Sequence, residues 1–226
     1  MAGLGNPLAS AMPGPRPPAT PEDLADVLRG AGIDDPRLLD AFRRVPRAAF
    51  VPSESRQRAY DDAPVPIAHG LVTTQPSLLA LMVQALRLRG DERVLEIGTG
   101  LGFQTAILAT LSREVISIEW FADLAERART NLKGVGLSNV TVRVGDGSLG
   151  VAERAPFDGI LVAAAAPRVS TALVAQLAEG GRLVQPLGTG GDDQVVAFVK
   201  RLGQLVEEAT LTGAHFVPLR GAFGVR

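Results

Sequence analysis

The segment from Val94 to Gly102 (VLEIGTGLG) constrains the fold more strongly than any other part of the chain. An apolar run typical of a buried strand passes into a turn with three glycines, and a helical pattern begins at Gly102. Glycines in such a turn allow tight backbone conformations and a close approach to a ligand. Open α/β sheets bind ligands beyond the carboxyl ends of their strands. We therefore expect an α/β fold with a binding site where this strand ends.

The chain after Gly90 alternates short β-branched runs with helical runs, which is the pattern of consecutive β-α-β units. The pattern predicts a mostly parallel central sheet with helices on both faces. The predicted strands cover 93–97, 115–119, 140–144 and 157–163, with helices from residue 102 and over 121–133, and further strands at 181–186, 194–199 and around 216–219.

The N-terminal part of the chain has a different character. Residues 1–19 contain five prolines and few large apolar side chains, so we expect a disordered tail, because this composition cannot offset the entropy of ordering. Thr20, a following proline and two acids mark the start of a helix that ends near Gly30, and a second helix is predicted from Asp35. These two helices are expected to form a small helical cap.

Residues 61–76 form an irregular, proline-rich run, and an amphipathic helix with Pro76 in its first turn follows. We expect a single domain over residues 20–226. Within it, residues 20–76 would form the cap and a substrate loop, and residues 77–226 the α/β core.

Composition limits the function classes. The 226 residues, 46% of them apolar, can bury one sizeable core. The 23 basic and 24 acidic residues give a net charge of -1, so no overall electrostatic attraction to nucleic acid or to an anionic membrane is expected. The absence of cysteine excludes disulfides, thiolate metal sites and cysteine nucleophiles, and we expect no metal. Neither a signal peptide nor a membrane-spanning segment is expected.

The spacing of the glycines and two acids favours a nucleoside ligand. The dinucleotide fingerprint needs its third glycine three residues after the second, but position 103 is Phe, and no phosphate-loop Gly-Lys-Ser or Gly-Lys-Thr follows. Glu119 ends the next predicted strand, where its carboxylate can accept two ribose hydroxyls. Asp146, in Gly145-Asp146-Gly147, can accept a hydrogen bond from an adenine amino group. Each feature alone also fits a ligand-free turn, whereas their shared order favours binding.

Together, these motifs resemble those of Rossmann-like methyltransferases that use S-adenosyl-L-methionine (AdoMet). The resemblance implies AdoMet as the cofactor. It assigns cofactor binding to Glu96, Gly98, Thr99, Gly100, Gly102, Glu119, Asp146 and Gly147.

Several short segments outside the cofactor motifs carry further information. They are RVPR at 44–47, FVP at 50–52, AYDD at 59–62, PIAHG at 66–70, TTQP at 73–76, PFDGI at 156–160, AAAP at 164–167, EGGRLV at 179–184 and FVPL at 216–219. In these segments and their order, the sequence resembles the protein-L-isoaspartate O-methyltransferase family over about residues 43–219.

That resemblance implies a monomeric, cytoplasmic enzyme that methylates the α-carboxyl of L-isoaspartyl and D-aspartyl residues in damaged proteins and peptides, which starts repair through a succinimide. Thr74 stands where the family usually has a serine treated as the active-site hydroxyl, so Thr74 is the expected catalytic residue. His69, Thr73 and Gln75 are expected to bind substrate. The N-terminal amides of the helix that follows would also favour an anion.

Two alternative functions remain open at this point. One is methylation of ordinary aspartate in a dedicated peptide during natural-product maturation, with which the threonine at position 74 is compatible. The other is a non-catalytic AdoMet-binding module, although the retained hydroxyl of Thr74 favours catalysis. Thr73 and Thr74 are also compatible with a role limited to capping the helix near Pro76, and His69 with a structural role.

Overall fold

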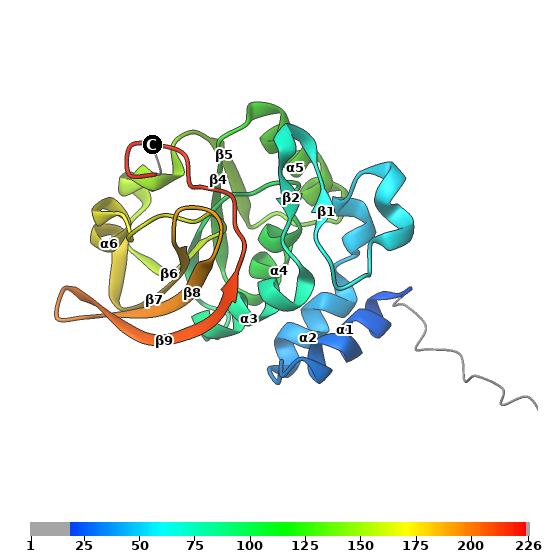
Figure 1. Cartoon of the computed structure of the whole chain (residues 1–226), viewed down its shortest axis with the longest axis horizontal. Helices are drawn as coiled ribbons and strands as arrows, with labels where there is room; N and C mark the ends of the chain where they lie inside the picture. The colour runs from blue at the N-terminus through cyan, green and yellow to red at the C-terminus, as the bar shows by residue number, and fades with distance from the viewer. Residues whose placement is uncertain (1–18, 225–226) are drawn as a thin grey trace, which may run out of the picture.

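A seven-stranded sheet forms the centre of the computed structural model, which describes residues 19–224 (Figure 1). The strand order is β5-β4-β3-β6-β7-β8-β9. The five strands from β5 to β7 run parallel, and β8 and β9 are antiparallel to their neighbours. The strands are β3 (Arg93–Ile97), β4 (Glu114–Glu119), β5 (Val140–Val144), β6 (Phe157–Val162), β7 (Leu177–Leu187), β8 (Asp193–Arg201) and β9 (Gln204–Ala214).

The helices begin where local capping chemistry predicts. Thr20 and Asp23 form a reciprocal capping box at the start of α1, and the Asp35 carboxylate accepts the amide hydrogens of the first turn of α2. Pro76 opens α3 at its first position. The helices are α1 (Pro21–Gly30), α2 (Pro36–Arg44), α3 (Pro76–Leu86), α4 (Phe103–Leu111), α5 (Ala122–Gly134) and α6 (Thr171–Gln176).

Helices cover both faces of the sheet, as the sequence predicts, but unequally. Helices α1 to α5 contribute to one apolar core, which includes Phe42, Leu79 and Ile107. The opposite face packs against α6, through Leu173, and against short 3-10 segments. The predicted cap therefore shares its core with the sheet helices α3 and α4. The predicted tail falls almost entirely on residues 1–18, outside the described residues.

Two local predictions are wrong. The segment 216–219 is not a strand, because Pro218 has no amide hydrogen, and this segment makes only an isolated bridge to Ala165. The last strand is instead β9, an edge strand whose largely exposed, polar residues lack the alternation of a half-buried strand. In addition, the predicted irregular run contains a two-stranded antiparallel ribbon of β1 (Val65–Pro66) and β2 (Val72–Thr73).

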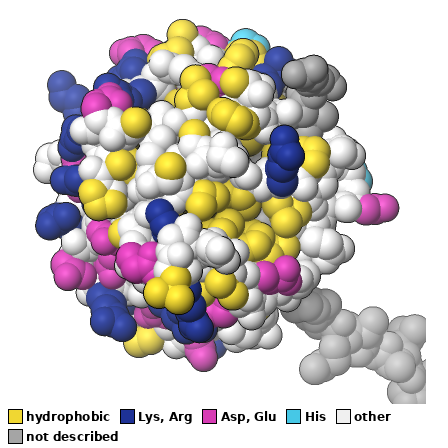
Figure 2. All heavy atoms as spheres, turned by 90° about the vertical axis from the view of Figure 1, so that its left-hand side faces the viewer, with side chains coloured by type: hydrophobic (Ala, Val, Ile, Leu, Met, Phe, Trp, Pro, Cys, Tyr) yellow, Lys and Arg dark blue, Asp and Glu magenta, His cyan; other side chains and the backbone are white. Residues whose placement is uncertain are grey.

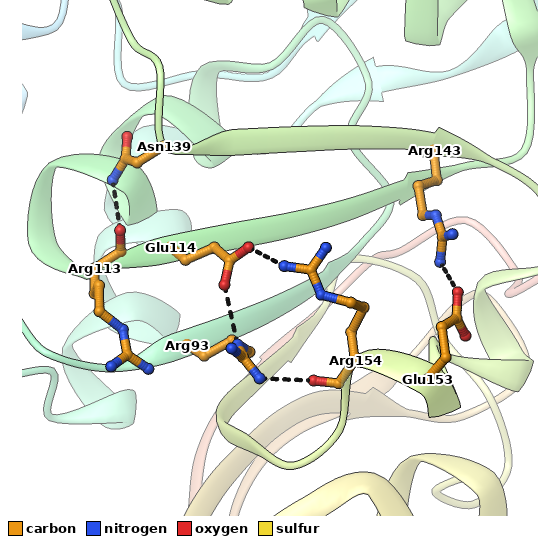
Figure 3. A network of polar contacts seen from close by, with 7 residues as sticks. All are labelled: Arg93, Arg113, Glu114, Asn139, Arg143, Glu153 and Arg154. Atoms are coloured by element: carbon orange, nitrogen blue, oxygen red, sulfur yellow. Dashed lines mark hydrogen bonds and ion pairs between the residues drawn. The ribbon is translucent and has the colours of Figure 1, made fainter.

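A polar network holds the amino-terminal ends of the central strands (Figure 3). Glu114 accepts hydrogen bonds from Arg93 Nε at 3.0 Å and from Arg154, and Arg93 also donates to the carbonyl of Arg154 at 3.0 Å. Glu114, Arg93 and Arg154 lie at the edge of the sheet opposite to the carboxyl ends of β3 and β4, so they stabilise the sheet away from the predicted ligand site. A separate pair, Arg143 with Glu153, lies near the carboxyl end of β5.

The surface on the side of α6, β7 and the C-terminus mixes both signs of charge around apolar side chains near the centre of the view (Figure 2). The Lys and Arg side chains on this face are interspersed with Asp and Glu side chains (Figure 2). Within residues 19–224, no helix is both long and apolar enough to cross a membrane.

Candidate active site

A cavity of about 540 Å³ opens at the carboxyl ends of β3, β4 and β6. The connections from β3 lead to β4 on one side, while β6 lies on its other side, so the cavity occupies the point where the strand order reverses. Residues 97–101, 118–121 and 163–164 form its floor, and the segments 69–74 and 217–220 form its outer walls. Glu119, His69 and Arg220 are the titratable residues among the described cavity lining.

The three positions of the glycine loop require glycine for different structural reasons. All three have a left-handed backbone, with φ of +95° at Gly98, +56° at Gly100 and +96° at Gly102. Gly98 and Gly100 line the cavity. A Cβ on Gly102 would instead lie 3.4 Å from side chains of Ala128 and Leu132, so this glycine allows α5 to pack against the loop.

Glu119 fixes the same loop from the neighbouring strand. Its Oε2 accepts a hydrogen bond from the Gly100 amide at 2.8 Å, and its Oε1 accepts one from the Phe121 amide at 3.0 Å. The side chain is only 4% exposed but lies in the cavity wall. Each carboxylate oxygen has a further lone pair with which it can accept a ligand hydroxyl.

Glu96 lies beneath the loop and outside the cavity lining, because its side chain points from the face of β3 toward α4. It is fully buried and accepts hydrogen bonds from Gln104 at 2.9 Å and from Thr105 and Ser117 at 2.5 Å. Burial raises the pKa of Glu96 to about 7, although these hydrogen bonds act in the opposite direction. Glu96 therefore supports the loop from below, and its expected contact with a cofactor stays a prediction.

A chain of hydroxyls connects Glu96 to the cavity. Ser117 has one hydroxyl hydrogen, which it donates to Glu96, so Thr99 must donate in its 2.5 Å hydrogen bond to Ser117. Thr99 lines the cavity and is 4% exposed. The conformation of the loop at Thr99 is thus linked to the buried carboxylate.

Gln104 is a cavity residue that the sequence analysis did not select. Its Nε2 donates to Glu96, but its Oε1 is buried and has no hydrogen-bond partner among the described residues. A buried acceptor without a partner is costly, so this oxygen destabilises the fold locally. The sequence feature that could have identified Gln104 is its position in the first turn of α4, directly after the glycine loop.

Arg47 holds the substrate loop from inside the protein. This fully buried guanidinium donates to the carbonyls of Ala59, Asp61 and Ala63 and, at 3.1 Å, to the hydroxyl of Thr73. Burial lowers its pKa to about 10, opposed by the nearby acids Asp62 and Asp61, so it remains charged near neutral pH. The Thr73 hydroxyl also accepts the Val65 amide at 3.0 Å, which gives this residue a structural role.

Asp62 holds the loop on the other side of Thr74. Its carboxylate accepts hydrogen bonds from Gln75 Nε2 at 3.1 Å and from the Ser77 amide at 2.8 Å. Asp62 therefore caps α3, and one of the N-terminal amides of this helix, that of Ser77, is already engaged. Thr74 lines the cavity, and its hydroxyl makes no hydrogen bond to another described residue.

His69 closes one side of the cavity mouth. Its backbone is left-handed, with φ of 62°, and its ring stacks on Phe121 at 3.8 Å. Its Nε2 donates to Asp123 at 2.9 Å, and this hydrogen bond lowers the pKa of Asp123. The guanidinium of Arg220 lies 5.2 Å from the same Phe121 ring. The loop at His69 is thereby connected to α5 and to the C-terminal segment.

Asp146 and Gly147 are not part of the cavity lining. The Asp146 carboxylate accepts the Ser148 amide at 2.9 Å and, from the C-terminal segment, the Ala222 amide at 2.7 Å. A Cβ on Gly147 would collide with Ile97, so the glycine permits close packing against β3. The acceptor expected for an adenine amino group is therefore engaged by the protein's own backbone.

Comparison with known families connects this cavity to a defined chemistry. A family model described as protein-L-isoaspartate(D-aspartate) O-methyltransferase matches residues 19–223. The chain belongs to this family. A protein-L-isoaspartate O-methyltransferase 2 from Marinobacter nauticus is 49% identical over 212 residues, which cover 90% of this chain and 97% of the relative. A protein-L-isoaspartate O-methyltransferase from Myxococcus xanthus is 48% identical over 200 residues, covering 87% and 94% of the two chains.

Two solved structures share the fold of this chain. A protein-L-isoaspartate O-methyltransferase superposes with a TM-score of 0.80 at 29% identity, covering 91% of this chain and 67% of that chain. A Plasmodium falciparum structure, described as a putative member of the family in complex with S-adenosyl-L-homocysteine, gives a TM-score of 0.78 at 24% identity. The alignment covers 89% of this chain and 98% of that one, and at this identity it supports the fold alone.

The first cavity brings together some, but not all, of the site residues expected from the sequence. Of the expected residues, His69, Thr73, Thr74, Gly98, Thr99, Gly100 and Glu119 line it. Gln75 lies instead in the wall of an adjacent cavity. Glu96, Gly102, Asp146 and Gly147 lie behind the lining and support it, in the ways described above. Arg47, Asp62, Gln104 and Arg220 complete the site and were not selected from sequence.

Proposed function

We propose that the chain methylates the α-carboxyl of L-isoaspartyl residues, and of D-aspartyl residues, in proteins and peptides with AdoMet as the methyl donor. The observation that carries the proposal is the free hydroxyl of Thr74 in the same cavity as the glycine loop and Glu119, in a member of this family. A silent AdoMet-binding module would not need that hydroxyl or the two side chains that hold its loop.

The residues of the cavity fit AdoMet. Glu119 has the remaining acceptor capacity for ribose hydroxyls, and the left-handed glycine loop lets a ligand approach the backbone of Gly98 and Gly100. Ile118, Trp120 and Ala163 offer an apolar wall for adenine.

The proposed chemistry asks mainly for positioning. AdoMet supplies a methyl group already activated by its sulfonium, and the substrate carboxylate is deprotonated near pH 7, so no general base is required. Thr74 donates a hydrogen bond to one carboxylate oxygen and orients the other toward the methyl carbon. Glu119 and Thr99 keep the loop fixed on the cofactor side.

The methyl ester would then act without further help from the protein. Esterification makes the carbonyl carbon a better electrophile. The neighbouring backbone nitrogen attacks it and displaces methanol, which gives a succinimide. Water opens the ring, and part of the product is ordinary aspartate. A damaged polypeptide is therefore the proposed partner.

We further propose that residues 20–226 act as one methyltransferase domain and that the enzyme is a cytoplasmic monomer. The shared core of α1 and α2 with α3 and α4 supports the first statement. The resemblance to the family supports the second. Light scattering of the purified chain tests the oligomeric state, and a mass of two chains would contradict it.

Methyl transfer from labelled AdoMet to two peptides that differ only in containing L-isoaspartate or L-aspartate tests the proposed function. We expect transfer to the isoaspartyl peptide alone. Thr74→Ala should lower kcat by about tenfold to a hundredfold, the effect of losing one hydrogen bond to a charged group, and Thr74→Ser should retain activity. Transfer to neither peptide, despite measurable AdoMet binding, would refute the proposal.

A further inference from the structure

A second cavity, of about 640 Å³, adjoins the first across the substrate loop. The two cavities share a wall made of Val72, Thr73, Thr74, Ala163 and Val217. Its other sides come from three distant parts of the chain: the turn after α1, the first turns of α3, and the end of β9 with the residues after it. Thr74 is thus accessible from both sides.

The second cavity differs from the first in its charge. Its described lining contains no Asp, Glu, Lys or Arg, and His215 is its one titratable residue. The first cavity, in contrast, presents Glu119 and Arg220. Ile33, Leu78, Leu81 and the other apolar side chains of the second cavity offer contact area without a partner for an ion.

We propose that this second cavity binds the residue next to the isoaspartyl residue in the polypeptide and selects an uncharged side chain there. The inference rests on the proposed function, because it concerns where the rest of that substrate lies. An isoaspartyl residue is part of a chain, and the first cavity must hold the cofactor as well as the reacting carboxylate. The substrate chain has to continue away from Thr74, and the second cavity begins on the other side of that residue.

The selection follows from desolvation. A charged side chain that enters a cavity lined by no Asp, Glu, Lys or Arg loses its hydration and gains no ion pair with such a residue, whereas an apolar side chain gains contact with Leu78 and Leu81. Both signs of charge should therefore be disfavoured. The effect should appear in kcat/KM for the peptide and leave AdoMet affinity unchanged.

A panel of isoaspartyl peptides with Leu, Lys or Glu directly before or directly after the isoaspartyl residue tests the inference. On at least one side, Lys and Glu should each lower kcat/KM by about tenfold or more relative to Leu. Equal values for all three residues on both sides would overturn the inference while methyl transfer itself still occurred. No transfer to any peptide would instead refute the proposed function.

A charged residue introduced into the wall of the second cavity tests whether this cavity causes the selectivity among peptides. Leu81→Lys should raise kcat/KM for the Glu peptide relative to the Lys peptide on the selective side, and Leu81→Glu should do the reverse. Val206→Lys adds the same charge on β9, at a 42% exposed residue that lines neither cavity, and should leave the ratio unchanged. An equal change in both lysine variants would contradict the assignment to this cavity. The wild-type panel is decisive on its own if a Leu81 variant does not fold.

Discussion

At the scale of single residues, hydrogen bonds to the two neighbours of Thr74 fix its position. Arg47 holds Thr73, and Asp62 holds Gln75, so the intervening hydroxyl is fixed in place without being used. Arginine suits this task because its planar group donates several hydrogen bonds in fixed directions, which lysine cannot reproduce.

Replacing Thr73 with valine tests this positioning. Thr73→Val keeps the shape of the side chain but removes the acceptor for Arg47 and for the Val65 amide. We expect a loss of about 1–3 kcal/mol in the free energy of unfolding and a lower kcat with unchanged AdoMet affinity. Methyl transfer and titration calorimetry measure these, and Thr73→Ser should restore both. An unchanged kcat in the valine variant would show that Thr74 needs no such support.

Glu96 predicts a pH dependence of stability. Its pKa is raised from 4.5 to about 7 in the folded state, so between these values the folded protein binds a proton that the unfolded chain does not. This contribution is complete below about pH 4.5 and is lost as pH rises through about 7. Over that interval it amounts to about 3 kcal/mol. Denaturant unfolding of wild type and Glu96→Gln between pH 5 and 8 should therefore diverge, and parallel profiles would contradict the assignment.

At the scale of elements, the glycine loop connects the cavity to helix packing. Gly98 and Gly100 face the ligand space, whereas Gly102 faces α5, so one loop combines two requirements. The sequence marks all three positions alike. Only the packing of α5 distinguishes them.

Gly102→Ala is expected to cost more stability than Gly136→Ala. Both glycines have positive φ, at +96° and +78°, so each variant has a strain of about 1–2 kcal/mol. A Cβ at position 136 has no heavy atom within 4 Å, whereas one at position 102 meets Ala128 and Leu132. Thermal unfolding gives the difference, and AdoMet affinity should fall only for Gly102→Ala. Equal losses of stability in the two variants would mean that α5 moves away from the new Cβ without a free-energy penalty.

At the scale of the whole molecule, the cap and the α/β core share one apolar interior. Phe42 of α2 is 1% exposed and packs edge-on against Phe103 of α4 at 5.7 Å. Phe103 also lines the first cavity. The cap therefore contributes both to the interior and to the second cavity, where Ile33 forms part of the wall.

Phe42→Ala should lower the stability of the whole chain rather than of the cap alone. We expect a loss of about 3–5 kcal/mol and a single unfolding transition. The fluorescence of Trp120, the only tryptophan, reports the cavity wall after β4, and far-UV circular dichroism reports all helices. Val27→Ala, on the exposed side of α1, should change stability by less than about 0.5 kcal/mol. Separate transitions for the two probes would refute a single domain.

The sequence by itself determined the elements that local signals specify. The predicted strands at 93–97 and 140–144 have the observed bounds, and the starts of α1, α2 and α3 follow from Thr20, Asp35 and Pro76. Periodicity and capping depend on neighbours in the chain, which is why they can be read without a structure. The order of the motifs also identified the family.

Only the tertiary structure decided which residues from distant parts of the chain contact each site residue. Glu96 is turned to a buried network, and Asp146 accepts an amide from the segment at Ala222, 76 residues further along the chain. The sequence analysis did not predict the edge strand β9, because its mostly exposed residues show no alternation of buried and exposed positions. Local patterns fix the direction of a backbone, whereas hydrogen-bond partners and cavity walls depend on which distant elements pack together.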